Sequence, residues 1–133
     1  MRANRLSGAI AVAVIGAALL AVAAVPGEAK LVNDFCHPTG DYCVGVMKHS
    51  GNTKLDITTP SLTASYGLCA RRTANRTREC HHFRFKNKAG GLRESRVDFQ
   101  TRFGGPPSGR YCATWKYGGS RLHTLCFAYA RQI

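Results

Sequence analysis

The sequence has little negative charge and none of the common signatures of catalysis. Its 133 residues include 7 Asp and Glu against 19 Lys and Arg, a formal net charge of +12 at pH 7. It contains no Gly-x-Ser-x-Gly turn, no His-Glu-x-x-His pair, no phosphate-binding glycine loop and no Cys-x-x-Cys pair. The missing motifs exclude the familiar hydrolase families and the usual zinc patterns. The low number of acidic residues leaves few carboxylates for glycoside hydrolysis.

The chain also lacks cysteine in its first 35 residues, where an apolar leader lies instead. Two arginines precede an uninterrupted apolar run over residues 9–25, and small residues follow up to Ala29. This order is typical of a secretory signal peptide, and the run is shorter than the roughly 20 residues that span a bilayer. We therefore expect residues 1–29 to be removed after export. An earlier cleavage site at residues 21–23 and a retained membrane anchor are the alternatives.

The remaining residues, 30–133, are long enough for one domain and too short for two. They carry 17 Lys and Arg against 6 Asp and Glu, and ten of the basic residues fall between Arg71 and Arg102. Such concentrated charge attracts polyanions, whereas a role in solubility alone is the plainer alternative. The candidate anion-binding residues are Arg71, Arg72, Arg76, Arg78, Arg84, Lys86 and Lys88.

All six cysteines lie in this domain, and an even number in an exported chain favours three disulfides over a metal site. Six cysteines allow 15 pairings, so geometry has to choose among them. A disulfide between neighbouring antiparallel strands needs its cysteines to face each other, so the midpoint of the pair should fall on a turn. Two pairs pass this test and the third is left over: Cys112–Cys126, Cys69–Cys80 and Cys36–Cys43.

The domain alternates short runs of aromatic and β-branched residues with Gly, Pro and Asn, and no stretch keeps a helical apolar period for three turns. This pattern is typical of an all-β fold. We expect seven short strands, over residues 42–48, 54–58, 64–71, 78–86, 95–103, 111–117 and 121–129. Strands at this spacing predict a small disulfide-stabilised antiparallel sandwich or barrel.

In the last expected hairpin, the pairing of Cys112 with Cys126 sets the register and leaves a three-residue loop, residues 118–120. Trp115 and Tyr117 then share one largely apolar face. Aromatic residues on such a face are ordinary sheet stabilisers, so this face is the better candidate for core. Toward the open tip, Trp115 and Tyr117 are also candidates for aromatic contact with a ligand.

The enzymatic hypothesis with physical support is metal-independent RNA cleavage, which needs a base, an acid and cations. Residues 79–86 contain all of these types. Strand alternation places His82 on an outward cationic face and His81 on the inward face. The catalytic candidates are His82 or His123 with Glu79. We expect no metal and no cofactor, because adjacent histidines on a strand point to opposite faces.

The sequence therefore favours a secreted cationic β domain that binds an anionic target, such as an envelope polymer, a membrane surface, a nucleic acid or an acidic protein. Such a domain suits an antimicrobial or toxin-like effector, or an enzyme inhibitor that presents a disulfide-anchored loop, residues 37–41 or 70–79. The alternatives are a small extracellular ribonuclease and a structural exported protein. Binding without catalysis is favoured, and the alanine-rich leader indicates a bacterial source.

Overall fold

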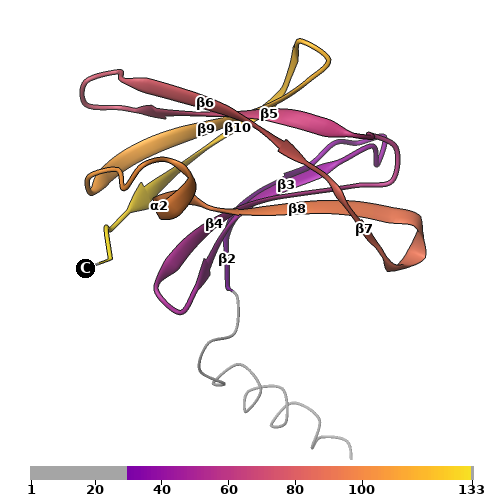
Figure 1. Cartoon of the computed structure of the whole chain (residues 1–133), viewed down its shortest axis with the longest axis horizontal. Coiled ribbons are helices and arrows are strands. Elements are labelled where there is room, and N and C mark those ends of the chain that lie inside the picture. Colours follow the sequence, from indigo (N-terminus) through magenta and orange to yellow (C-terminus); the bar gives the residue numbers. More distant parts are fainter. Residues whose placement is uncertain (1–29, 133) are drawn as a thin grey trace, which may run out of the picture.

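The computed structural model describes residues 30–132, which form two antiparallel sheets packed face to face as a sandwich (Figure 1). The strands are Lys30–Cys36 (β2), Cys43–His49 (β3), Asn52–Thr59 (β4), Ser65–Arg72 (β5), Arg78–Arg84 (β6), Lys86–Lys88 (β7), Leu92–Asp98 (β8), Gly109–Tyr117 (β9) and Ser120–Tyr129 (β10). One sheet has the order β10-β9-β5-β6, and the other has the order β2-β3-β4-β8-β7. The all-β prediction is confirmed, with nine strands in this part of the chain rather than seven. The expected signal peptide lies outside the described residues.

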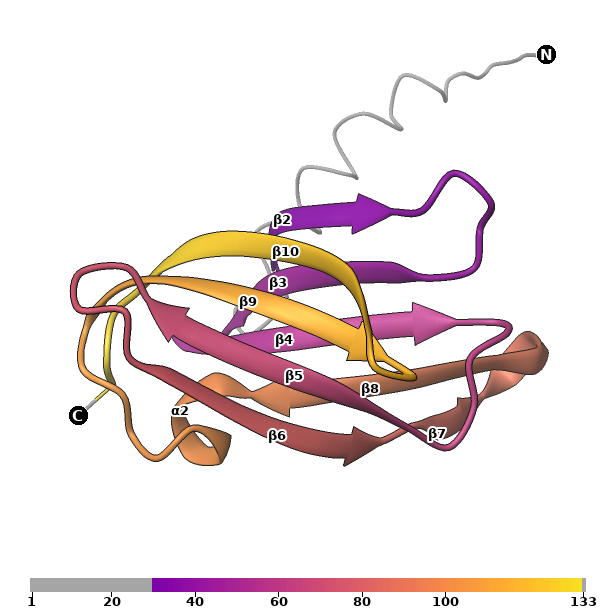
Figure 2. The ribbon, with the colours of Figure 1, turned by 90° about the horizontal axis from the view of Figure 1, so that it is seen from above.

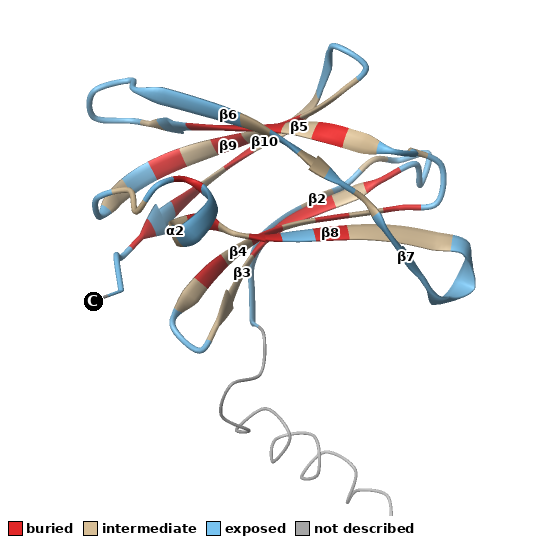
Figure 3. Cartoon of the chain, viewed as in Figure 1, coloured by how far each residue is buried: buried red, intermediate tan, exposed pale blue. Residues whose placement is uncertain are grey.

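The core lies between the sheets, and buried residues alternate with half-buried or exposed ones along central strands such as β4 and β9 (Figure 3). Seen from above, the four-stranded sheet lies across the five-stranded one (Figure 2). Leu55 on β4 and Leu68 and Trp115 on β5 and β9 are 0% exposed. Tyr66 links the two sheets by donating its hydroxyl to Ser95 Oγ at 2.9 Å. Burial of this ring raises the pKa of Tyr66 to about 12.

Three disulfides join the cysteine pairs that hairpin geometry selects: Cys36–Cys43, Cys69–Cys80 and Cys112–Cys126. In each case the two cysteines lie directly opposite each other on neighbouring antiparallel strands. Two of the three bridges belong to the four-stranded sheet. They lie on its outward side, because the residues immediately before and after the cysteines in β5, β9 and β10 face the core.

Strand β2 is not predicted by the apolar pattern, because most of its side chains are exposed. Leu31 and Val32 are 53% and 49% exposed, so no alternation of polar and apolar residues marks the strand. It is held at the edge of the five-stranded sheet by its pairing with β3 and by the disulfide between Cys36 and Cys43. A covalent link of this kind substitutes for the buried face that a strand in the middle of a sheet would have.

The strand expected over residues 78–86 is divided between the two sheets. β6 ends at Arg84, and β7 pairs with β8 in the other sheet. Between them the Phe85 amide donates to the Ala64 carbonyl at 2.9 Å. In Figure 1 the chain passes at this point from the four-stranded sheet down to the edge of the five-stranded one. Residues that one long strand would have aligned on a single surface are therefore separated.

The strand expected over residues 95–103 is also wrong in its second half, which forms the short helix α2, Phe99–Arg102. The Asp98 side chain caps this helix by accepting from the Thr101 amide at 3.1 Å. Phe99 is 0% exposed and packs its ring 5.0 Å from Tyr111. Aspartate is a favoured N-cap residue, and here it begins a helix despite the β propensity of Phe99 and Phe103.

Candidate anion-binding face

The outward side of the four-stranded sheet is built from three rows of residues that lie opposite one another on β10, β9, β5 and β6. The first row is Arg121, Lys116, Gly67 and His82. The second row is Thr124, Thr114, Cys69 and Cys80. The third row is Cys126, Cys112, Arg71 and Arg78. We call this surface the cationic face and define it by Arg71, Arg78, Lys116 and Arg121.

Arg121 joins this face through the geometry of the last turn. The loop has two residues rather than the expected three, because Gly118 and Gly119 both adopt positive φ, 59° and 83°. Two such residues suit the tight turns that match the twist of a hairpin. Arg121 then pairs with Lys116, and the register shifts by one residue at Leu122, which packs against the core. The loop prediction is therefore wrong, and its correction places a second cation beside Lys116.

The cationic face holds two pairs of like charges at directly opposite positions. Arg71 faces Arg78 across β5 and β6, and Lys116 faces Arg121 across β9 and β10. Within residues 30–132 every ion pair uses other side chains, so no carboxylate lies within 4.0 Å of these four cations. Like charges placed directly opposite each other destabilise a sheet. The arrangement therefore lowers stability and leaves positive charge open to an outside partner.

A groove of about 510 Å³ runs between the two cation pairs. Its floor contains Cys69, Cys112 and the hydroxyls of Thr114 and Thr124, which lie 2.8 Å apart. The first and third rows are four residues apart along β9, β5 and β6, which corresponds to about 13 Å along the strands, and the two cation pairs are also offset across the sheet. An extended anion with repeated charges matches two cation pairs at this separation better than a single small ion does.

A second hollow, of about 480 Å³, continues from the groove over Gly67. A Cβ atom at this glycine would come within 3.7 Å of His82 Nε2 and 3.6 Å of Lys116 Cβ. The exposed imidazole of His82 therefore lies beside a gap in the first row, where no side chain stands between it and Lys116. This extends the surface available to a ligand from β10 to β6.

The seven residues expected to bind anions do not form one surface. Arg71 and Arg78 lie on the cationic face, and Arg84 lies on the same side of β6 at the end of the strand. Arg72 points to the other side of β5, where its Nη2 donates to the Ser108 carbonyl at 3.0 Å. Arg76 lies in the turn between β5 and β6 and has a φ of 61°.

Lys86 and Lys88, the other two expected residues, belong to β7 and hence to the five-stranded sheet. Lys88 Nζ lies 3.5 Å from Glu94 Oε1. The charge cluster in the sequence is therefore divided in space. Conversely, Lys116 and Arg121 lie outside that cluster but belong to the cationic face. The alternation of inward and outward residues along the strand from Cys112 is the sequence signal that places Lys116 on this side.

The expected aromatic contact through Trp115 is wrong, because this side chain is 0% exposed in the core. Tyr117 is half-buried, and its hydroxyl donates to the Thr63 carbonyl at 3.1 Å and accepts from the Thr63 amide at 3.1 Å. Neither ring is presented to a ligand. The cationic face therefore offers charge and hydroxyl groups, and His82 is the one ring among its three rows.

The three catalytic candidates lie apart. His82 is on the outward side of β6, whereas Glu79 is on the other side and pairs with His81 at 2.5 Å. His123 stacks on Phe35 of β2, with ring centroids 3.7 Å apart and planes 3° from parallel. The structure thus does not bring His82, His123 and Glu79 to one reaction centre.

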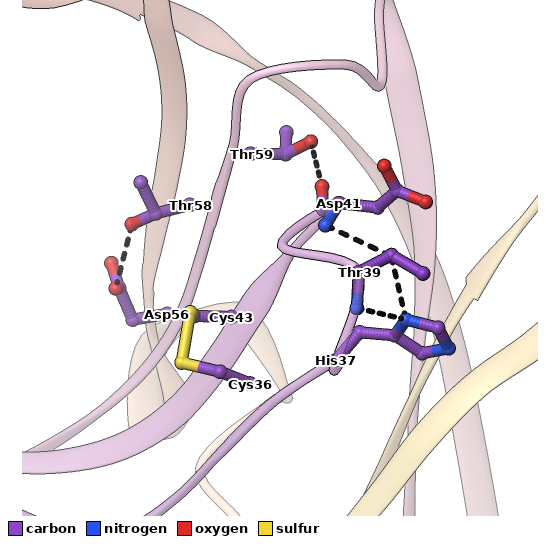
Figure 4. Close-up of a disulfide and its surroundings, with 8 residues drawn as sticks. All are labelled: Cys36, His37, Thr39, Asp41, Cys43, Asp56, Thr58 and Thr59. Atoms are coloured by element: carbon purple, nitrogen blue, oxygen red, sulfur yellow. Dashed lines mark hydrogen bonds between the residues drawn. A yellow bond between two sulfur atoms is a disulfide. The ribbon is translucent and has the colours of Figure 1, made fainter.

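The disulfide-anchored loop over residues 37–41 is fixed by its own hydrogen bonds (Figure 4). His37 Nδ1 lies 2.8 Å from Thr39 Oγ1, which also accepts from the Asp41 amide at 3.3 Å. The Thr59 hydroxyl donates to the Asp41 carbonyl at 2.6 Å and ties the loop to β4. The loop belongs to the five-stranded sheet. In the other candidate loop, regular strand structure extends to Arg72 and resumes at Arg78, so only the residues between them form a turn.

Fold and site together define a three-disulfide antiparallel β-sandwich with a cationic face that carries no acid. Within residues 30–132 no cluster of three His, Cys, Asp or Glu side chains is arranged to hold a metal ion. The same part of the chain contains no helix long and apolar enough to cross a membrane. Comparison with protein-family models, curated proteins and solved structures finds no match to this chain.

Proposed function

We propose that this is an exported protein whose sandwich binds a linear polyanion along the cationic face. The proposal rests on two pairs of like-charged residues at opposite cross-strand positions, Arg71 with Arg78 and Lys116 with Arg121, with no carboxylate of the described residues within 4.0 Å of them. A polymer that bears repeated phosphate, sulfate or carboxylate groups would relieve both repulsions at once. Three disulfides and a signal-like leader support an oxidising, extracellular place of action.

The surface chemistry supports an anionic envelope polymer over single-stranded nucleic acid. Proteins that bind single strands combine a cationic groove with aromatic rings on which bases stack. Here Trp115 is buried and Tyr117 is bonded to Thr63, so the groove recognises charge and hydroxyl groups without a stacking platform. This surface suits a polymer that is bound through its charged backbone. Binding to nucleic acid, membranes and acidic proteins is measured in the same experiment.

The test compares two double variants that remove equal charge from different sheets. Arg71→Gln with Lys116→Gln changes the cationic face, and Lys54→Gln with Arg96→Gln changes the five-stranded sheet. The probe is labelled linear polyphosphate, followed by fluorescence anisotropy across a salt series, with polyglutamate, RNA and anionic vesicles as parallel arms. The first variant should weaken binding at least about tenfold. It should also reduce the salt dependence of binding, because each protein cation that binds the polymer releases counterions from it and this variant has two fewer such cations. Equal losses in both variants would refute a defined face.

A further inference from the structure

A separate cleft of about 380 Å³ lies at one end of the sandwich, next to the turn between β5 and β6 and to helix α2. Its floor is apolar and includes Phe99, Phe103 and Tyr111. Its polar lining comes mainly from the turn and the strands beside it. The volume falls within the range of roughly 300–1,000 Å³ that is usual for small-molecule sites.

Arg72 supplies the strongest chemical feature of this cleft. Its Nη2 donates to the Ser108 carbonyl at 3.0 Å, but its Nε is buried and has no hydrogen-bond acceptor among residues 30–132. Gly109 leaves the room for this guanidinium, because a Cβ atom there would come within 3.2 Å of Arg72 Nε. A buried donor on a charged group without a partner is costly. A carboxylate or phosphate oxygen is the acceptor that suits a guanidinium best.

The rest of the cleft defines what should accompany that oxyanion. The Phe103 ring lies 5.2 Å from the Phe99 ring at the floor, with the two planes tilted by 35°, and Pro106 and Pro107 form the adjoining wall. Tyr111 donates its hydroxyl to the Pro107 carbonyl at 2.6 Å, which fixes this wall in place. A flat apolar group packs well against aromatic rings and prolines.

We propose that this cleft binds a small amphiphilic anion, with a carboxylate or phosphate on Arg72 and a flat apolar group against Phe103 and Pro106. Most residues of the cleft lie outside the cationic face, so ligand binding in the cleft can be tested separately from polymer binding. Arg71 and Arg72 are neighbours in sequence, yet one belongs to the cationic face and the other lines the cleft. Arg78 lines both sites, so it is left unchanged in the test.

The experiment titrates the purified oxidised protein with phenyl phosphate, benzoate and inorganic phosphate, and follows amide shifts by NMR. Phenyl phosphate should bind at least about tenfold more tightly than inorganic phosphate, because only the former fills the apolar floor. Arg72→Gln should weaken phenyl phosphate binding about tenfold or more, as expected for the loss of a charge-assisted bond. Equal affinity for phenyl phosphate and inorganic phosphate would overturn the proposal, as would shifts away from the cleft.

Arg71→Gln is the matched control and should leave phenyl phosphate binding unchanged while it weakens polyphosphate binding. Failure of the cleft and failure of the cationic face are therefore distinguishable. If Arg72→Gln does not fold, Glu79→Gln provides the second test. Glu79 lines the cleft and is 49% exposed, so its replacement should not disturb the core. Removing its charge should tighten phenyl phosphate binding severalfold, and weaker or unchanged binding would contradict the proposed site.

Discussion

The outward sides of the two sheets use charge in opposite ways. On the five-stranded sheet, Lys54 lies opposite Asp98 at 3.0 Å and Asp56 lies opposite Arg96 at 3.3 Å. On the four-stranded sheet, the corresponding cross-strand positions hold like charges, Arg71 with Arg78 and Lys116 with Arg121. On the outward side of the five-stranded sheet Lys54 and Arg96 are thus paired with acids, whereas the four cations of the cationic face have no ion pair within residues 30–132. A high net charge alone would not produce such a division.

The division also gives meaning to the placement of the disulfides. The cationic face carries two of the three bridges, Cys69–Cys80 and Cys112–Cys126, in the rows between and beside its like-charged pairs. Each bridge restricts the unfolded chain and so stabilises the fold without using surface charge. A sheet that repels itself can therefore stay folded and keep its cations for a partner.

Reversing the charge of two residues on the cationic face should have the largest effect on the difference in anion binding between the two faces. Arg71→Glu with Lys116→Glu should weaken polyphosphate binding at least about a hundredfold at low salt, because attraction at two positions becomes repulsion. Each new carboxylate would lie opposite Arg78 or Arg121, so the free energy of unfolding should not fall. Anisotropy and urea denaturation measure the two effects. Binding that survives the double reversal would contradict the assigned face.

Removing a disulfide should have the next largest effect, on stability. Cys112→Ala with Cys126→Ala should lower the free energy of unfolding by about 3 kcal/mol, because the bridge closes a loop of moderate length. The sequence separation is 14 for this pair and 7 for Cys36 and Cys43. Loss of the shorter bridge should therefore cost about half a kcal/mol less in the same urea experiment. The reverse order would show that strand pairing, rather than chain entropy, controls the contribution.

The outward side of the five-stranded sheet can be tested at Asp98, which caps α2 and accepts a hydrogen bond from Lys54. Burial acts to raise the pKa of Asp98, but the bonds from Lys54 and Thr101 outweigh it and hold the pKa below its usual value. Asp98→Ala should lower the free energy of unfolding by about 1–2 kcal/mol at neutral pH. Because the folded pKa is depressed, this contribution is complete above the unfolded value of about 4 and disappears as the pH falls through the folded pKa.

Urea denaturation from pH 7 to pH 2 provides the measurement for Asp98. The stability curves of the wild type and Asp98→Ala should converge at acid pH, and Lys54→Met should reproduce part of the effect. Curves that remain parallel would show that the carboxylate contributes nothing that depends on its charge.

The smallest expected effect concerns the cost of like charges. Arg78→Thr should raise the free energy of unfolding by about 0.5 kcal/mol at low salt, and the gain should shrink as salt screens the repulsion. Arg96→Thr is the matched change on the five-stranded sheet and should destabilise, because it removes the partner of Asp56 and Glu94. If both substitutions have the same sign, the contrast between the two faces has no energetic basis.

The features predicted from sequence are those set by local geometry. The cysteine pairs follow from hairpin midpoints because each bridge joins neighbouring strands. β2 escapes detection because an exposed edge strand has no buried face to create a pattern. The crossing after Arg84 depends on which sheet edge is available, and this is a property of the whole fold.

The candidate site was only partly predictable for a related reason. Counting charge along the chain groups Arg71 with Lys88, although they lie in different sheets. Counting charge across the register instead groups Arg71 and Arg78 with Lys116 and Arg121, which are distant in sequence. The register of β9 and β10 depends on the turn at Gly118 and Gly119, so an error of one residue in that loop hides Arg121.

The most direct test of the central claim is an amide NMR map of the protein titrated with linear polyphosphate at moderate salt. We expect shifts concentrated on β9, β5 and the facing parts of β10 and β6, around Lys116 and Arg71. Amides around Lys54 and Arg96 should stay unchanged, because their charges are already paired. Shifts spread evenly over both sheets would contradict a dedicated cationic face and would reduce the binding to general electrostatic attraction.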